Sequence, residues 1–275
     1  MKKTSKKAIV AGLAAALAIG MGNFAAAKSI RITVTNVAQT GGLSLTPLYF
    51  GFHDGSVDLF DAGAAASEGI EEIAETGNFM PLRDERLAQQ GTSLGGVAAG
   101  GGGALAGPIE PGESTTFTID LDSELNRFLS FASMILPSND SFIGNDDPTR
   151  FALFDNDGNF LGPQTINVTS EFAYDAGTEA NDPANGPAFV VGQDINLGGP
   201  GEGTIQAASS LSDFVGLSLA GGLTLDAALI DFINDPNFSF ARIEISEVPL
   251  PPAILLMGLG LSALGYKSRR KTKTA

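Results

Sequence analysis

The sequence predicts an all-β domain built from many short strands, with one or two short helices. Three observations predict this fold class. Hydrophobic residues make up 43% of the chain and charged residues only 17%, which supplies material for a core. The 35 Gly and 14 Pro imply many turns, and several short runs alternate apolar with polar residues. No break divides residues 28–247, so we expect one domain there within the 275 residues.

The clearest strand signal lies in residues 28–38, where Ile30, Ile32 and Val34 alternate with arginine and threonine. This two-residue period is typical of a half-buried strand. Comparable runs, each bounded by Gly, Pro, Asn or Asp, predict further strands at residues 45–53, 114–121, 127–136, 150–154, 164–172 and 238–246.

Helices and turns are expected between these strands. Ser67 is a suitable N-cap for a helix over residues 66–76, which Gly77 would end, and a second helix is predicted at residues 81–90. The Gly-rich residues 91–107 predict a mobile loop. The Asp157-Gly158 pair predicts a hairpin turn, because such a pair tolerates positive φ.

The N-terminal segment, residues 1–27, predicts a Sec-type signal peptide with a signal helix. It has a basic start, an apolar run over residues 8–21 and three alanines that end at Ala27. The apolar run is short for a membrane span and is followed by residues that suit a signal peptidase. We therefore expect export, with cleavage after Ala27.

The C-terminal segment, residues 248–275, has three parts in order. Val248, Pro249, Leu250 and Pro251 precede an apolar stretch, which a basic cluster beginning at Lys267 follows. This order resembles the PEP-CTERM sorting signals of Gram-negative bacteria, in the variant that begins VPLP. The resemblance implies a hydrophobic helix that enters the membrane at least transiently, an exosortase-like processing enzyme as partner, and a cell-surface or extracellular-matrix location. A plain C-terminal membrane anchor is the alternative.

Charge and composition exclude several functions. The basic residues gather at the two ends, so the body is more acidic than the formal net charge of −15 suggests, and it would repel nucleic acid. No cysteine is present, which excludes disulfides and thiol catalysis. His53 is the only histidine, and no nucleophile motif accompanies it, so we expect a structural role for it.

Two acidic clusters follow predicted strands, at residues 137–142 and 174–182. Loops at one rim of a β-sandwich bring distant carboxylates together, and such hard oxygen ligands suit Ca²⁺. Ordinary solvated loops are the alternative.

Four ordered segments, at residues 59–70, 73–77, 128–140 and 175–179, resemble the spondin domain. This resemblance implies an antiparallel β-sandwich related to calcium-dependent lipid-binding modules. It also implies Ca²⁺ as cofactor, with Asp140, Asp175 and Glu179 as its ligands. At the last position the family has aspartate, and glutamate keeps the carboxylate on a chain one methylene longer.

These observations predict an exported, non-catalytic, calcium-binding protein of the cell surface or biofilm matrix, acting in adhesion. Its partners would include exopolysaccharide or surface proteins. One alternative is a secreted hydrolase of matrix polysaccharide that uses paired carboxylates such as Glu68 and Glu75. A passive structural surface protein is another.

Overall fold

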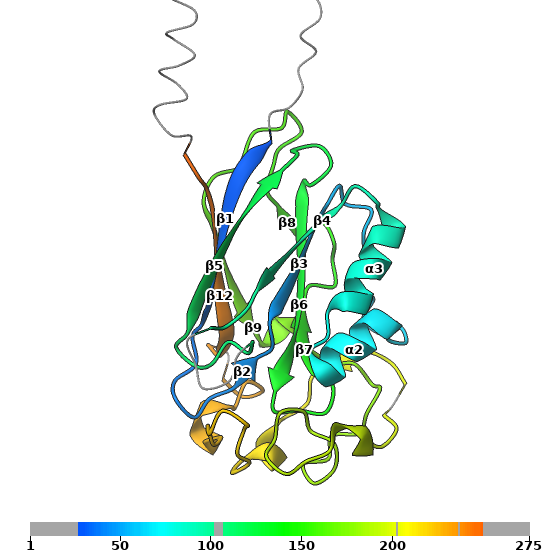
Figure 1. Ribbon diagram of the computed structural model, residues 1–275, viewed down its shortest axis with the longest axis vertical. Coiled ribbons are helices and arrows are strands. Elements are labelled where there is room, and N and C mark those ends of the chain that lie inside the picture. Colours follow the sequence, from blue (N-terminus) through cyan, green and yellow to red (C-terminus); the bar gives the residue numbers. More distant parts are fainter. Residues whose placement is uncertain (1–26, 102–106, 202, 236, 250–275) are drawn as a thin grey trace, which may run out of the picture.

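Two antiparallel sheets packed face to face form the computed structural model, which describes residues 27–101, 107–201, 203–235 and 237–249 (Figure 1). The antiparallel β-sandwich implied by the sequence is therefore confirmed. The signal peptide lies outside the described residues except for Ala27, and the sorting segment except for Val248 and Pro249. Over the described ranges, no helix is long and apolar enough to cross a membrane.

The smaller sheet contains the first and last strands of the described chain. In β1, Ile30, Ile32 and Val34 are fully buried while the residues between them are more exposed, which confirms the predicted alternation. β12 pairs with β1 along most of its length. The strand order is β5 (Ser114–Leu121), β1 (Lys28–Asn36), β12 (Ser239–Glu247) and β9 (Gln164–Thr169).

The larger sheet is buried on both faces at its centre, since the smaller sheet covers one face and helices cover the other. In β3, Phe50 and Phe52 face the smaller sheet, while Tyr49 faces the helices. β2 (Ser44–Leu45) and β8 (Phe151–Ala152) pair with β6 beside the main path. That path runs β11 (Gln206–Ala207), β10 (Ala173–Asp175), β7 (Ser141–Gly144), β6 (Phe128–Leu136), β3 (Leu48–His53) and β4 (Leu94–Ala98).

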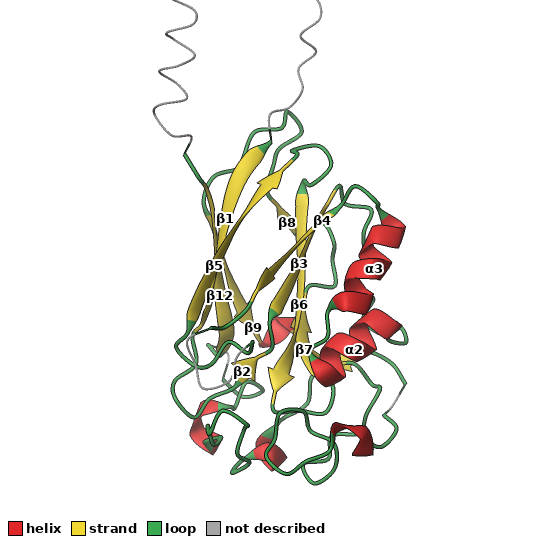
Figure 2. Cartoon of the chain, viewed as in Figure 1, coloured by secondary structure: helices red, strands yellow, loops and turns green. Residues whose placement is uncertain are grey.

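Both predicted helices are confirmed, as α2 (Glu68–Thr76) and α3 (Met80–Gln89) on the outer face of the larger sheet (Figure 2). The Ser67 hydroxyl accepts a hydrogen bond from the Ile70 N–H at 3.3 Å and so caps the first turn of α2. Gly77 ends α2 with a φ of 74°, a left-handed conformation that glycine adopts without strain.

The predicted mobile loop at residues 91–107 is wrong for its first part, because Leu94–Ala98 form strand β4. A Cβ on Gly96 would lie 2.4 Å from the Phe117 ring, so glycine lets β4 approach β5 closely. Gly96 thus allows a tight contact between the two strands. The predicted strands at residues 150–154 and 164–172 are shorter than expected, and the run at residues 45–53 is divided between β2 and β3.

The two ends of the sandwich differ. Ile30 near the start of β1 pairs with Glu247 at the end of β12, so the described chain begins and finishes at one end. The long segment between β10 and β12 is mostly loop with short 3₁₀ turns, and it covers the opposite end (Figure 1). We call this opposite end the loop end. Both acidic clusters lie there, at the ends of β6 and β10.

Candidate functional site

The turn between β6 and β7 is buried and tightly fixed. Ser138, Asn139 and Asp140 are each 0% exposed. The Ser138 hydroxyl donates to the Ile135 carbonyl at 2.7 Å and accepts from the Ser141 N–H at 3.1 Å. This local bonding turns the chain sharply at the edge of the core. Consequently the Asp140 carboxylate is held below the surface.

The two oxygens of Asp140 have different surroundings. Oδ2 accepts from the Thr178 N–H at 2.9 Å, the Glu179 N–H at 3.0 Å and the Thr178 hydroxyl at 3.3 Å. Oδ1 is buried and accepts no hydrogen bond from the described residues. A buried carboxylate oxygen without a donor destabilises the fold, because burial removes its hydration and no hydrogen bond replaces it. One oxygen therefore anchors the neighbouring loop, and the other is available to a ligand.

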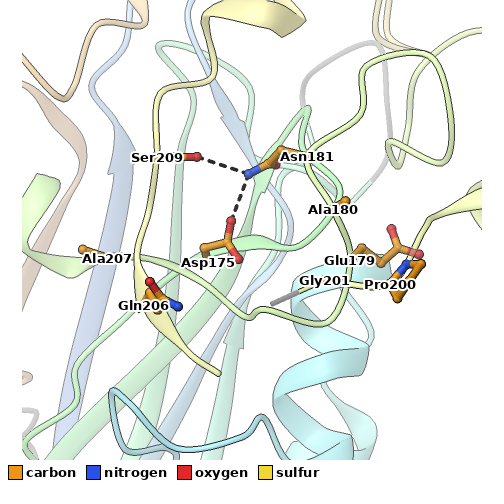
Figure 3. A pocket seen from close by; sticks show the side chains of 9 residues that line it. All are labelled: Asp175, Glu179, Ala180, Asn181, Pro200, Gly201, Gln206, Ala207 and Ser209. Carbon is orange, nitrogen blue, oxygen red and sulfur yellow. Dashed lines mark hydrogen bonds between the residues drawn. The ribbon is translucent and has the colours of Figure 1, made fainter. Parts of the chain in front are cut away.

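Asp175 ends β10 and lies beside a second oxygen of this kind. Its Oδ1 accepts from the Gly177 N–H, and its Oδ2 accepts from the Asn181 side-chain amide, both at 2.9 Å (Figure 3). Asn181 also donates to the Ser209 hydroxyl at 3.2 Å. With its amide nitrogen engaged twice, the Asn181 Oδ1 atom is buried and has no donor among the described residues.

A cavity of about 360 Å³ opens beside Asp175 and Asn181. Gly201 and Ser209 also line it, and Figure 3 shows the Asn181 amide pointing across it toward Asp175 and Ser209. Because its lining is rich in oxygen atoms and open to solvent, the cavity suits a hydrated cation or a small polar ligand.

Glu179, the third predicted ligand, points away from Asp175 (Figure 3). Its carboxylate accepts one long hydrogen bond, 3.4 Å, from the Asn139 amide. A Cβ on Gly198 would overlap this carboxylate, at 1.7 Å from Oε1, so the absence of a side chain on Gly198 creates its place. Asp140 and Asp175 are near enough to interact electrically. Even so, in the part of the chain that the structure describes, no three Asp, Glu or His side chains converge as a metal-binding group.

Burial and neighbouring negative charges raise the pKa values of the carboxyl groups in this cluster. Burial first, and then the charge of Asp175, raise the pKa of Asp140 to about 6. Burial raises the pKa of Glu75 to about 7, despite a hydrogen bond from the Thr178 side chain that lowers it, and the charge of Glu179 raises it further. A cation placed among these groups would relieve both the lost hydration and the repulsion.

Sequence reasoning missed the place of Glu75 in this cluster. Glu75 lies half-buried on the last turn of α2, outside the larger sheet, and its side chain reaches Thr178 in the loop after β10. Glu68, its partner in the hydrolase alternative, lies exposed at the first turn of the same helix. Because the contact between α2 and the loop is tertiary, neither local pattern contained a signal for it.

His53 lies apart from the acidic cluster, at the end of β3 and on the face of the larger sheet that Tyr49 shares. It is 0% exposed, its Nε2 lies 3.0 Å from the Ser130 hydroxyl, and its Nδ1 accepts from the Gly55 N–H at 3.1 Å. Burial lowers the pKa of His53 to about 4, so the ring is neutral at physiological pH. These bonds and this burial fit the structural role that the sequence predicts.

Comparison with known proteins places the fold and the loops in one family. No curated protein matches the chain. The Spondin_N family model matches residues 42–190, a region that contains both the Asp140 turn and the Asp175 loop. Since this region covers more than half of the sequence, the chain belongs to the Spondin_N family of spondin-like extracellular domains.

Proposed function

We propose that this chain is an exported, non-catalytic protein that binds Ca²⁺ through its spondin domain and acts in adhesion or matrix interaction at the cell surface. One observation carries the calcium assignment. Asp140 Oδ1 and Asn181 Oδ1 are buried and have no hydrogen-bond donor within the described ranges, and both residues approach Asp175, whose carboxylate lines the open cavity. Oxygens left in this state are suited to coordinate a hard cation.

The chemistry of the donors favours Ca²⁺ over softer metals. All the candidate donors are carboxylate or amide oxygens, the chain has no cysteine, and the lone histidine is engaged inside the core. Asp140, Asp175 and Asn181 would hold the ion. Glu179 would supply a third carboxylate by turning from Asn139, and the 3.4 Å hydrogen bond that it would give up is weak. When bound, Ca²⁺ would neutralise the cluster and brace the two loops.

Export and sorting complete the proposal. Residues 1–27 would direct Sec export, and residues 248–275 would be processed by an exosortase-like enzyme or would anchor the protein in a Gram-negative envelope. The pairing of β1 with β12 supports this arrangement, because the first and last described residues then lie at the end of the sandwich opposite the cation site (Figure 1). The site would face away from the membrane, toward exopolysaccharide or other surface proteins.

Thermal unfolding of the purified chain, in EGTA and in excess Ca²⁺, tests the calcium assignment. A ligand at a hundred times its Kd stabilises the native state by about 2.7 kcal/mol. For a domain of this size that corresponds to a rise in Tm of roughly 5–10 °C. The rise should vanish in Asp175→Ala and persist in Asp157→Ala, which removes an exposed aspartate elsewhere. Equal melting points with and without calcium in the unmodified chain would refute the assignment.

The non-catalytic part of the proposal has its own test. The half-buried Glu75 is engaged with Thr178 and the exposed Glu68 lies two helical turns away, an arrangement that supports a structural use of both. We expect no release of reducing ends when the chain is incubated with the exopolysaccharide of the producing bacterium. Release that Glu75→Gln abolishes would instead establish the hydrolase.

A further inference from the structure

A second cavity at the loop end lies outside the set of candidate calcium ligands. It measures about 420 Å³ and is lined by Pro187, Phe189, Val190, Asp194 and Ile195 among others. The same loop exposes two further apolar side chains, Val191 at 64% and Leu197 at 58%. Apolar side chains gathered beside a cavity are typical of a contact surface for another molecule.

The fold holds this loop in place, with Val190 buried and Val191 exposed. The Ala220 N–H donates to the Phe189 carbonyl at 2.7 Å, and the Val191 N–H donates to the Ser218 carbonyl at 2.9 Å. Phe189 has a φ of 60°, and it is the one non-glycine residue with positive φ in the described part of the chain. Backbone strain of this kind persists only where the surroundings impose it. The Phe189 ring lines the cavity and packs against the buried cluster that contains Met134 and Leu136, which fixes it at the cavity wall.

The charged side chain in the lining of this cavity is acidic. Asp194 lines it, and its Oδ1 accepts from the Asn196 N–H at 3.0 Å and the Asn196 amide at 2.8 Å. These bonds lower the pKa of Asp194, so it is ionised at physiological pH. In addition, every charged residue in the sequence between Arg150 and Arg242 is acidic. Such a surface attracts basic groups and repels anionic lipid and nucleic acid.

We propose that this cavity binds a basic segment of a partner protein, with a lysine or arginine side chain as the anchor. The aliphatic part of the anchor would pack against Phe189 and Ile195, and its charge would face Asp194. Long basic side chains combine an apolar stem with a charged end, and their cations also bind over aromatic rings. Apolar side chains next to the anchor would contact Val191 and Leu197. A polypeptide supplies both kinds of group in alternation.

The position of the cavity suits this role. The described chain begins and finishes at the far end of the sandwich, so a protein tethered through its C-terminal segment would present this surface outward (Figure 2). The cavity shares no residue with the proposed calcium ligands, and therefore the two proposals can fail separately.

The test measures fluorescence anisotropy of a short labelled peptide that alternates arginine and leucine, titrated with the full chain at physiological ionic strength. We expect saturable binding that is about tenfold weaker with Asp194→Asn and unchanged with Asp157→Asn. Phe189→Gly should also abolish binding. Glycine adopts the positive φ without strain, and the Phe189 ring is only partly buried, so this variant should stay folded by circular dichroism at a small cost in stability. Leu197→Ser should weaken binding more than Leu161→Ser, since Leu161 is a similarly exposed leucine outside this loop.

Several results would overturn the proposal. They are the absence of saturable binding, equal binding of a peptide with glutamate in place of arginine, and equal losses in Asp194→Asn and Asp157→Asn. Sedimentation that shows self-association lost in Phe189→Gly would assign the surface to a second copy of the chain. Binding to phosphatidylserine vesicles that the same variant abolishes would assign it to a membrane.

Discussion

Two aspartate turns of this protein use the same residue in opposite ways. Asp155 lies at the surface in the turn that the sequence predicts at Gly158, whose φ of 78° confirms it. Its Oδ1 accepts from the N–H groups of Asp157 and Asn159, and its Oδ2 accepts from the Asn159 amide at 3.0 Å. Both oxygens are thus engaged. Asp140 is buried, and one of its oxygens has no donor among the described residues.

The consequence is a pKa shift of opposite sign in the two turns. Hydrogen bonds, the Asn159 side chain first, lower the pKa of Asp155, while burial raises that of Asp140 to about 6. A carboxylate that stabilises its own turn needs no further partner. Asp140 has a desolvation cost in the isolated fold, which a bound cation would offset. The two turns therefore differ in the way that the calcium proposal requires.

The largest expected effect comes from making the same substitution in both turns. In EGTA at pH 8, Asp140→Asn should raise the free energy of unfolding by on the order of 2 kcal/mol, because it removes a buried charge and keeps an acceptor for the Thr178 and Glu179 N–H groups. Asp155→Asn should lower it slightly, since charge-assisted hydrogen bonds are lost. Urea denaturation monitored by circular dichroism measures both. Equal signs would remove the distinction between the turns.

The stability contributions of Asp140 and Asp155 should also depend on pH in opposite directions. The pKa of Asp140 is raised on folding, so its penalty is absent below about pH 4 and develops as pH rises toward 6 and above. The pKa of Asp155 is lowered, so its stabilising contribution is present above about pH 4 and is lost as pH falls through the folded value.

His53 complicates a single pH profile, because burial lowers its pKa to about 4 and its ionisation gives stability that rises between about pH 4 and 6.5. The measurement is therefore the difference between each Asn variant and the unmodified chain at every pH, in which the His53 contribution cancels. A difference for Asp140→Asn that does not change between pH 4 and 7 would contradict the assigned shift.

A smaller effect is expected at Glu179. Gly198→Ala should displace the Glu179 carboxylate from its place beside Asn139. If Glu179 turns to join the cation, this variant should bind calcium as well as the unmodified chain or better, whereas Glu179→Gln should bind about three- to tenfold more weakly. Calcium titrations at constant ionic strength measure both. An unchanged Kd in Glu179→Gln would remove Glu179 from the ligand set.

Much of the fold could be predicted because its signals are local. The alternation in β1 and the caps of α2 at Ser67 and Gly77 each lie within a few residues. Strand β4 could not be predicted in this way, since Gly96 is explained by the Phe117 ring on another strand. Its glycine content indicates a loop until that tertiary contact is known.

The same limit applies to the candidate site. The sequence predicts that two acidic loops after strands come together, and the turn with Asp140 and the loop with Asp175 do lie together. The direction of Glu179 depends on Gly198, far along the chain, and the contribution of Glu75 depends on how α2 packs. Sequence patterns therefore located the loops, and the packing between distant segments determines which oxygens are available.

Isothermal titration calorimetry of the full chain with Ca²⁺ at neutral pH tests the central claim most directly, in parallel with Asp140→Asn and Asp155→Asn. If Asp140 holds the ion, the unmodified chain and Asp155→Asn each show a single saturable site, and Asp140→Asn shows none. Because burial raises the pKa of Asp140 to about 6 and that of Glu75 to about 7, each group carries a proton in part of the molecules between pH 6 and 7, and calcium binding in that range should also release protons, seen as heats that differ between buffers. Equal calcium binding by Asp140→Asn, or no saturable heat in the unmodified chain, would contradict this claim.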